Sequence, residues 1–317
     1  MYGRIRKFPA LCAYAAGGLF TLLCGWFPGF AVVWLRLFIC PSGRLLTVIF
    51  ARLPFPLLEI AAFLLMAFLV FGLLRAMLLC LQTRRFRAMK AFLRQLTGIT
   101  AVLFCTCAFL WFPSYWAAPS NDSPASAEQL DALCGMLIDR LNDAQLRFSG
   151  HDESLALAQA VVSAALDAPI PENAVKTARY PEWMNVFGIS GFYSPWTGEA
   201  VVHPDLVPAA RIFTAVHELI HAQGVADEGY ANILAWRLCR RAGGEAAESA
   251  DLFALRYAMQ RLRTHSEDLW RARTQTMDPA LKDIFASIGG FAPSPSERPA
   301  PFRYSALADR LANSLPD

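Results

Sequence analysis

Long apolar stretches in the first third of the chain constrain the fold more than any other feature of the sequence. Three of them, at about residues 9–28, 57–79 and 97–116, have the length of about 20 residues that an α-helix needs to cross a bilayer. The whole chain of 317 residues is 55% apolar and 17% charged, whereas soluble domains average about 25% charged residues. The sequence therefore predicts a membrane domain over residues 1–118 with about three transmembrane helices.

A further apolar stretch, residues 30–52, is interrupted by Arg36, Arg44 and Arg52. These charges disfavour a free span, and arginine side chains can extend from a helix toward the headgroups. We therefore expect this stretch to be an interfacial segment. Glu59, near one end of the second span, is expected at the depth of the headgroups rather than as an intramembrane functional acid.

The orientation follows from the distribution of basic residues. They gather between the second and third spans, at Arg75, Arg84, Arg85, Arg87, Lys90 and Arg94, and also at the N-terminus. Loops rich in Lys and Arg stay in the cytoplasm. Three crossings then predict a multi-pass protein of the cell membrane with a cytoplasmic N-terminus and an extracytoplasmic C-terminal domain. The lipid bilayer is thus an expected partner, and the small net charge of +3 gives no footprint for nucleic acid.

Residues 119–125 are rich in turn-forming residues and are predicted to be a linker to a domain spanning residues 126–317. The sequence of that domain predicts mostly helices, and the first of them is capped by Ser126. Residues 186–202 form the one stretch with β character and predict a hairpin, whose edge strand is suited to pairing with an extended peptide. Cys134 and Cys239 fall in this domain, either as a disulfide or as two buried free thiols.

The segment from Thr214 to Asn232 contains an H-E-x-x-H motif at His217, Glu218 and His221. Positions i and i+4 of a helix lie one turn apart on the same face, so the two imidazoles can bind one Zn²⁺. In this motif the Glu acts as general base on the water activated by the metal. Only five histidines occur in the chain, and two fall in this register, which favours a zinc site over two hydrogen-bonded core histidines.

The third metal ligand has two candidates, Asp227 and Glu228. Asp227 would complete a pattern in which Gly224 turns the chain back toward the metal. Glu228 would be a ligand from the first turn of a second helix, with Asp227 at its N-cap, a position that Asp favours and Glu does not. We prefer Glu228, with Asp227 as the alternative. Asn232, one turn further on, is predicted to support a ligand by hydrogen bonding from outside the metal's coordination sphere.

Three segments, GFYSPWTGEAVVHPDL, HELIHAQG and DEGYANILAWRLC, resemble a family of bacterial membrane-embedded H-E-x-x-H proteins catalogued as a domain of unknown function. The resemblance is close over residues 190–240 and loose over the N-terminal helices. It implies a gluzincin-like zinc peptidase domain outside the membrane, with a Glu at the position of Glu228 and Ala-Asn at 231–232. The position of Asp227 is not typically acidic in that family. The family usually has a further acidic residue in this segment, and this chain has Tyr230 at that position.

The predicted fold is mainly α, with transmembrane helices followed by an α-rich, zincin-like domain that carries a small β-hairpin. We expect a membrane-anchored zinc metallopeptidase acting on a peptide or protein, with Glu218 as catalytic base and Zn²⁺ held by His217, His221 and Glu228. Tyr193, Tyr230 and Tyr304 are candidate donors to the oxyanion. The alternative is a non-catalytic membrane sensor or scaffold that retains the zincin fold. Cleavage within the bilayer is disfavoured because the motif's helix is too polar.

Overall fold

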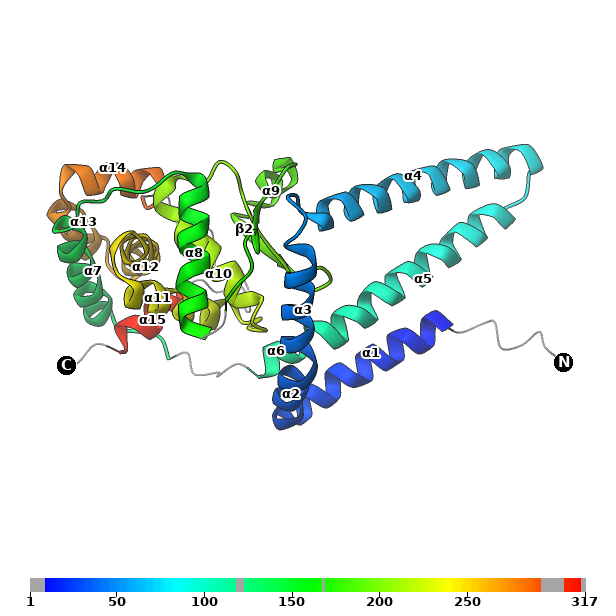
Figure 1. Ribbon diagram of the computed structural model, residues 1–317, viewed down its shortest axis with the longest axis horizontal. Helices are drawn as coiled ribbons and strands as arrows, with labels where there is room; N and C mark the ends of the chain where they lie inside the picture. Colours follow the sequence, from blue (N-terminus) through cyan, green and yellow to red (C-terminus); the bar gives the residue numbers. More distant parts are fainter. Residues whose placement is uncertain (1–8, 118–122, 167–168, 292–304, 315–317) are drawn as a thin grey trace.

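The computed structural model describes residues 9–117, 123–166, 169–291 and 305–314. Long apolar helices from the N-terminal third extend away from a C-terminal helical domain that contains one small sheet (Figure 1). Within the described residues, four segments are long and apolar enough to cross a membrane, namely Pro9–Trp26, Pro28–Phe50, Leu57–Thr83 and Arg87–Trp116. This supports the expected association with a membrane.

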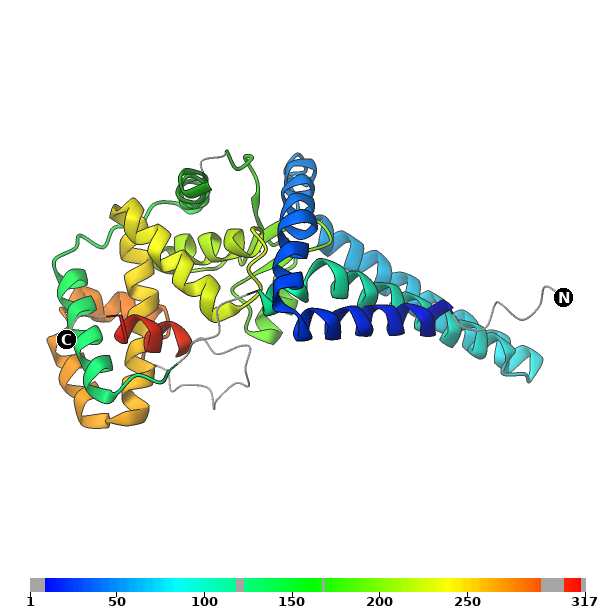
Figure 2. The ribbon, with the colours of Figure 1, turned by 90° about the horizontal axis from the view of Figure 1, so that it is seen from below.

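Three of these segments extend in the same general direction (Figures 1 and 2). They are α1 (Pro9–Trp26), α4 (Leu57–Thr83) and α5 (Arg87–Leu110), followed by the short α6 (Pro113–Trp116). The third span was expected to begin near residue 97, but its helix starts ten residues earlier in sequence, so the basic residues after Arg87 extend it. Helix α1 packs along α5, where Gly17 leaves room for the ring of Phe104. Helix α4 meets α5 near their connecting turn and diverges from it toward the C-terminal domain.

The fourth apolar segment runs crosswise to the other three in both views (Figures 1 and 2). It consists of α2 (Pro28–Trp34), a π-helical turn (Leu35–Ile39) and α3 (Cys40–Phe50). One side of it is buried against the rest of the protein. The other side exposes large apolar residues, including Val33, Leu37, Phe38, Leu45, Val48 and Ile49. Length and composition also qualify this segment as a span, but its crosswise course is compatible with the interfacial position predicted for residues 30–52.

The C-terminal domain is built around α10 (Pro208–His221), which is buried on nearly every side. Helices α8 (His151–Leu166), α11 (Glu228–Ala242) and α12 (Gly244–His265) pack directly against it. Around them lie α7 (Ala127–Asn142), α13 (Glu267–Thr276), α14 (Pro279–Ser287) and α15 (Ser305–Ala312). As predicted, Ser126 caps α7, and it forms a reciprocal capping box with Gln129. The chain is thus mainly helical, as expected.

The sheet is larger than the predicted hairpin. Strands β2 (Gly191–Ser194) and β3 (Glu199–Val202) pair antiparallel, and β1 (Val175–Thr177) adds to β3 in parallel, giving the order β1-β3-β2. The predicted β stretch began at residue 186, but its first two residues belong to the helix α9 (Glu182–Phe187). Gly188, at a φ of 62°, ends this helix in the left-handed conformation that favours glycine. The prediction of a strand here followed from the aromatic and β-branched residues on either side of Gly188.

Cys134 and Cys239 are both buried and both free, so of the two alternatives the structure has the pair of thiols. Burial raises the pKa of each thiol above its ordinary value. Each therefore behaves as a small apolar core residue.

A buried ion pair joins the sheet to the apolar helices. Lys176 on β1 and Glu199 on β3 lie 2.5 Å apart with almost no exposed side-chain surface. The Lys176 ammonium also donates to the carbonyl of Phe50, at the end of α3, and to that of Phe55, in the connection to α4. The Glu199 carboxylate accepts from the backbone N–H of Leu57, in the first turn of α4, at 2.9 Å. Each of the two charged groups thus forms hydrogen bonds with the backbone of the apolar N-terminal third. These bonds join that third to the C-terminal domain.

Further polar contacts reinforce this joint. Thr47 of α3 donates to the carbonyl of Gly198 at 2.7 Å. Glu59 accepts from the backbone N–H of Arg179 at 2.9 Å. Its carboxylate is buried against the C-terminal domain, a contact that the expectation of a headgroup position did not include.

Candidate metal centre

The H-E-x-x-H motif occupies the last turns of α10, where the helix is buried. Pro208 begins the helix at a position where its missing N–H costs nothing. The helix ends at His221, and Gly224, with a φ of 88°, turns the chain away from it. This glycine also lies against Leu35 and Cys40, where a Cβ would have no room. The turn predicted from the sequence therefore has a second role, which is to let the crosswise segment approach the motif.

His217, His221 and Glu228 bring three potential ligand atoms within 4.8 Å of one another. The Nε2 atoms of the two histidines lie 2.9 Å apart. The Glu228 carboxylate is 3.1 Å from Nε2 of His217 and 3.6 Å from Nε2 of His221. Donors that share one tetrahedral Zn²⁺ at about 2.0–2.1 Å are about 3.3 Å apart, so this buried set fits that ion.

The ring of His221 is held by the turn that follows it. Its Nδ1 lies 2.5 Å from the carbonyl oxygen of Val225. A ring nitrogen facing a carbonyl carries a proton, so Nδ1 is the donor to Val225 and Nε2 is the atom that faces the other candidate ligands. The local fold thus orients the ring as a metal ligand needs.

Asp227 and Glu228 make different contacts and therefore have different roles. The Asp227 side chain accepts from the backbone N–H of Tyr230 at 2.6 Å and caps α11, as predicted. Glu228 is the first residue of α11 and faces the two histidines. Since the short carboxylate is already used by the backbone, Glu228 rather than Asp227 stands in the candidate ligand set.

Asn232 lies fully buried one turn after Glu228. It is close enough to His217 to raise the pKa of that ring, but its amide atoms form no hydrogen bond of regular geometry, and neither does Nδ1 of His217. These unpaired polar atoms adjoin each other beside the proposed ligand. The predicted supporting role therefore has His217 as its neighbour.

The charges of the centre are strongly coupled. Burial and the neighbouring His221 lower the pKa of His217. For His221, burial lowers the pKa, but the hydrogen bond to Glu228 and the charge of Glu218 outweigh it and raise the pKa to about 9. Burial raises the pKa of Glu228, but hydrogen bonds from both histidines outweigh it and hold the pKa well below the usual range. The geometry therefore keeps one anionic carboxylate facing two imidazoles, which suits a bound cation.

Glu218 is buried beside the three donors, and burial raises its pKa to about 8. It lies beneath the start of strand β2. A Cβ added to Gly191 would be 2.8 Å from the Glu218 carboxylate, closer than any real contact. Gly191 is thus required by the close approach of the strand to Glu218, a contact between distant segments that no local pattern predicts.

The membrane-associated helices contribute to the wall of the centre. The indole of Trp111, at the end of α5, packs edge-on against the ring of His221 with centroids 5.8 Å apart. It also contacts the ring of Tyr193 on β2 at 5.4 Å. Tyr115 lies close enough to Glu228 and Asp227 for their charges to act on its phenol. Trp111 and Tyr115 were not among the site residues predicted from the sequence, since no local pattern links them to a motif a hundred residues later.

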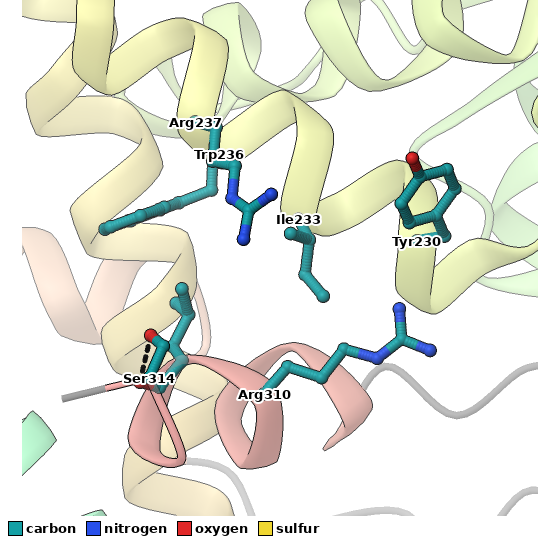
Figure 3. A pocket seen from close by; sticks show the side chains of 7 residues that line it. Tyr230, Ile233, Trp236, Arg237, Arg310 and Ser314 are labelled. Carbon is teal, nitrogen blue, oxygen red and sulfur yellow. Dashed lines mark hydrogen bonds between the residues drawn. The ribbon is translucent and has the colours of Figure 1, made fainter. Parts of the chain in front are cut away.

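The three tyrosines considered as oxyanion donors have different positions. Tyr193 is near the centre, but its hydroxyl is directed toward Gly43 of α3, and burial raises its pKa. Tyr230 lines a separate pocket of about 270 Å³ between α11 and α15, together with Arg310 and Trp236 (Figure 3). Tyr304 lies outside the described residues. Tyr193 adjoins Trp111, one of the side chains that surround the metal centre.

Comparison with known proteins places the chain in a family without assigning an activity. No curated protein and no solved structure matches it. A family model described as "Protein of unknown function (DUF3810)" matches residues 38–303. This range includes α3, the apolar helices α4 and α5, the sheet and the whole metal centre. The chain is therefore a member of the DUF3810 family of proteins of unknown function.

Proposed function

We propose that this protein is a membrane-anchored zinc metallopeptidase. The observation that carries the proposal is the convergence of His217, His221 and Glu228 within 4.8 Å, with Glu218 buried beside them. Three protein ligands leave one position for a water molecule, the arrangement of catalytic rather than structural zinc sites. A bound Zn²⁺ would supply Lewis acidity, which lowers the pKa of water and polarises a carbonyl.

Glu218 is the general base of the proposed reaction. Its carboxylate takes a proton from the attacking water and later gives that proton to the leaving amine, so that the peptide bond breaks with no net change in the enzyme. Glu218 is buried beside the three candidate ligands, which is the position that this role requires. His217, His221 and Glu228 hold the cation and do not exchange protons with substrate.

The surrounding architecture supports a zincin-like arrangement. Helix α10 lies under the β1-β3-β2 sheet, and α11 delivers the third ligand from its first turn. Strand β2 is at the edge of the sheet and passes over Glu218. An extended substrate can pair with such an edge through its backbone, which holds a peptide bond near the base.

We further propose that α1, α4 and α5 cross the membrane, with the N-terminus in the cytoplasm and the C-terminal domain outside. The motivation is the cluster of basic residues around the turn between α4 and α5. A cysteine at Ser126, in a variant lacking native thiols, should react with an impermeant reagent applied from outside. Protection of that cysteine would contradict this topology.

Metal analysis of the full-length purified protein tests the site. We expect one zinc ion per chain in the wild type and in Glu218→Gln, and loss of zinc in His217→Ala. Membranes carrying wild-type protein should accumulate new peptide termini, detected by mass spectrometry, that are missing with Glu218→Gln. A non-catalytic sensor or scaffold would lose nothing by Glu218→Gln, and identical termini in the two membranes would favour it.

A further inference from the structure

The metal centre lies at the level of the tryptophans that end the apolar helices, Trp26, Trp111 and Trp116, hereafter the aromatic belt. Trp26 and Trp116 end α1 and α6, and Gly25 lies against the Trp116 ring, so the helix ends are level with each other. Aromatic residues at helix ends of this kind lie at headgroup depth. Trp111 belongs to the same belt and contacts His221 directly. The proposed ligand is therefore at the membrane surface, and no soluble spacer separates it from the bilayer.

The β2–β3 hairpin extends from the centre past the belt. Trp196, in the turn of the hairpin, donates from its indole N–H to the Thr106 hydroxyl at 2.9 Å. Thr106 precedes Trp111 by five residues on α5, which corresponds to about 7 Å along a helix. The turn lies between the diverging ends of α4 and α5 (Figure 1). The tip of the hairpin thus reaches deeper than the belt.

Strand β2 therefore runs from the catalytic base toward the bilayer. Gly191, at its start, lies over Glu218, and Ser194, at its end, leads into the turn beside Thr106. A strand of four residues covers about 10 Å. Its second edge is unpaired within the described part of the chain, where the sheet order ends at β2. A polypeptide that pairs with this edge has one end in water and the other at the bilayer.

From this geometry we infer that the substrate is a membrane-anchored polypeptide, cut within a few residues of the point where it leaves the outer face of the bilayer. The inference rests on the proposed peptidase function and adds the substrate class. The crosswise segment lies against the same region, because Cys40 and Arg44 of α3 donate to Gln223 just after the motif, at 3.2 and 3.3 Å. These contacts close the centre on the side of α3.

The length of the tether between a lipid anchor and the site tests the inference. The protein is reconstituted in vesicles and offered peptide hydroxamates, which bind catalytic zinc, with an N-terminal palmitoyl chain and a Gly-Ser spacer of two or twelve residues. The spacers reach about 7 and 40 Å when extended. The readout is the rate at which 1,10-phenanthroline removes zinc, so no turnover is needed. An acetylated hydroxamate without lipid is the control.

We expect the two-residue probe to slow zinc removal at least as well as the twelve-residue probe. Protection by the long probe alone would place the open side of the metal away from the bilayer and overturn the inference, while leaving the zinc peptidase intact. Protection by the acetylated control but by neither lipid probe would also overturn it. If wild-type protein binds no zinc, or no hydroxamate protects bound zinc, the proposed function itself fails.

The depth of the hairpin gives an independent measurement. Trp196→Cys, on a background without native thiols, is labelled with bimane and quenched by lipids that carry nitroxide at known depths. Ala242→Cys, at the far end of α11, is the matched control. Quenching at Trp196→Cys by nitroxides in the upper acyl chain, but not at the control, supports the inference. Equal accessibility of both labels to a water-soluble quencher would contradict it.

Discussion

Helices α4 and α10 are both rich in apolar residues, but they lie in opposite environments. Of the 27 residues of α4, only Glu59 and Ala76 are buried, and its large apolar side chains are exposed. Helix α10 buries twelve of its 14 residues, among them Arg211, His217, Glu218 and His221. The exposed helix has almost no polar side chains, whereas the buried one contains the ionisable groups of the metal centre.

The difference shows where each helix finds partners for its polar groups. A lipid-facing helix must satisfy its backbone internally and gains nothing from charged side chains. The buried helix keeps ionisable residues because neighbouring elements supply partners, such as Val225 for His221 and Glu228 for both histidines. The Lys176–Glu199 pair joins the two environments, since it is buried and bonded to backbone from the apolar part.

Breaking this joint should have the largest effect on stability. We expect Lys176→Met to lower the free energy of unfolding by about 3–5 kcal/mol, because it leaves the Glu199 carboxylate buried without its partner. Denaturant titration of the full-length protein in detergent, followed by tryptophan fluorescence, measures the change. Lys282→Met on α14 is the matched control and should change stability by at most about 0.5 kcal/mol. Equal stabilities of the two variants would show that the joint is not needed.

The next effect concerns the two adjacent acids at the start of α11. Glu228→Gln should weaken zinc binding by at least about 100-fold, since loss of a ligand costs more than loss of the groups that support one. Asp227→Asn should stay within about threefold of the wild type, because Asn caps a helix as well as Asp. Competition with a fluorescent chelator measures both affinities. The reverse order would assign the third ligand to Asp227.

A smaller effect is expected where β2 crosses α10. Gly191→Ala introduces a Cβ at 2.8 Å from the Glu218 carboxylate, so the base must move. Misplacement of a catalytic group by about 1 Å lowers turnover by about 10- to 100-fold. The formation of new peptide termini in membranes should slow accordingly, with the zinc content unchanged. Gly150→Ala, where an added Cβ meets only an ordinary contact at 3.4 Å, is the control and should leave both quantities unchanged.

Several features were predictable because their signals are local. The helical spacing of His217 and His221, the cap at Asp227 and the capping box at Ser126 depend on residues within a turn or two of each other. Strand β1 was missed because three residues carry too little pattern, and its pairing partner β3 lies more than twenty residues away. The last two residues of α9, Val186 and Phe187, were included in the predicted β stretch because their β-branched and aromatic side chains favour a strand, whereas Gly188 ends a helix there.

The sequence by itself determined that apolar helices precede a mainly helical domain, and it determined which residues have the chemistry and spacing to hold a metal. Only the tertiary structure decided which acid faces the histidines, which glycine makes room for Glu218, and that Trp111 lies against His221. The physical reason is range. Periodicity, capping and hydrophobicity act between neighbours in the chain, whereas a buried site is assembled from side chains that the folding of distant segments brings together.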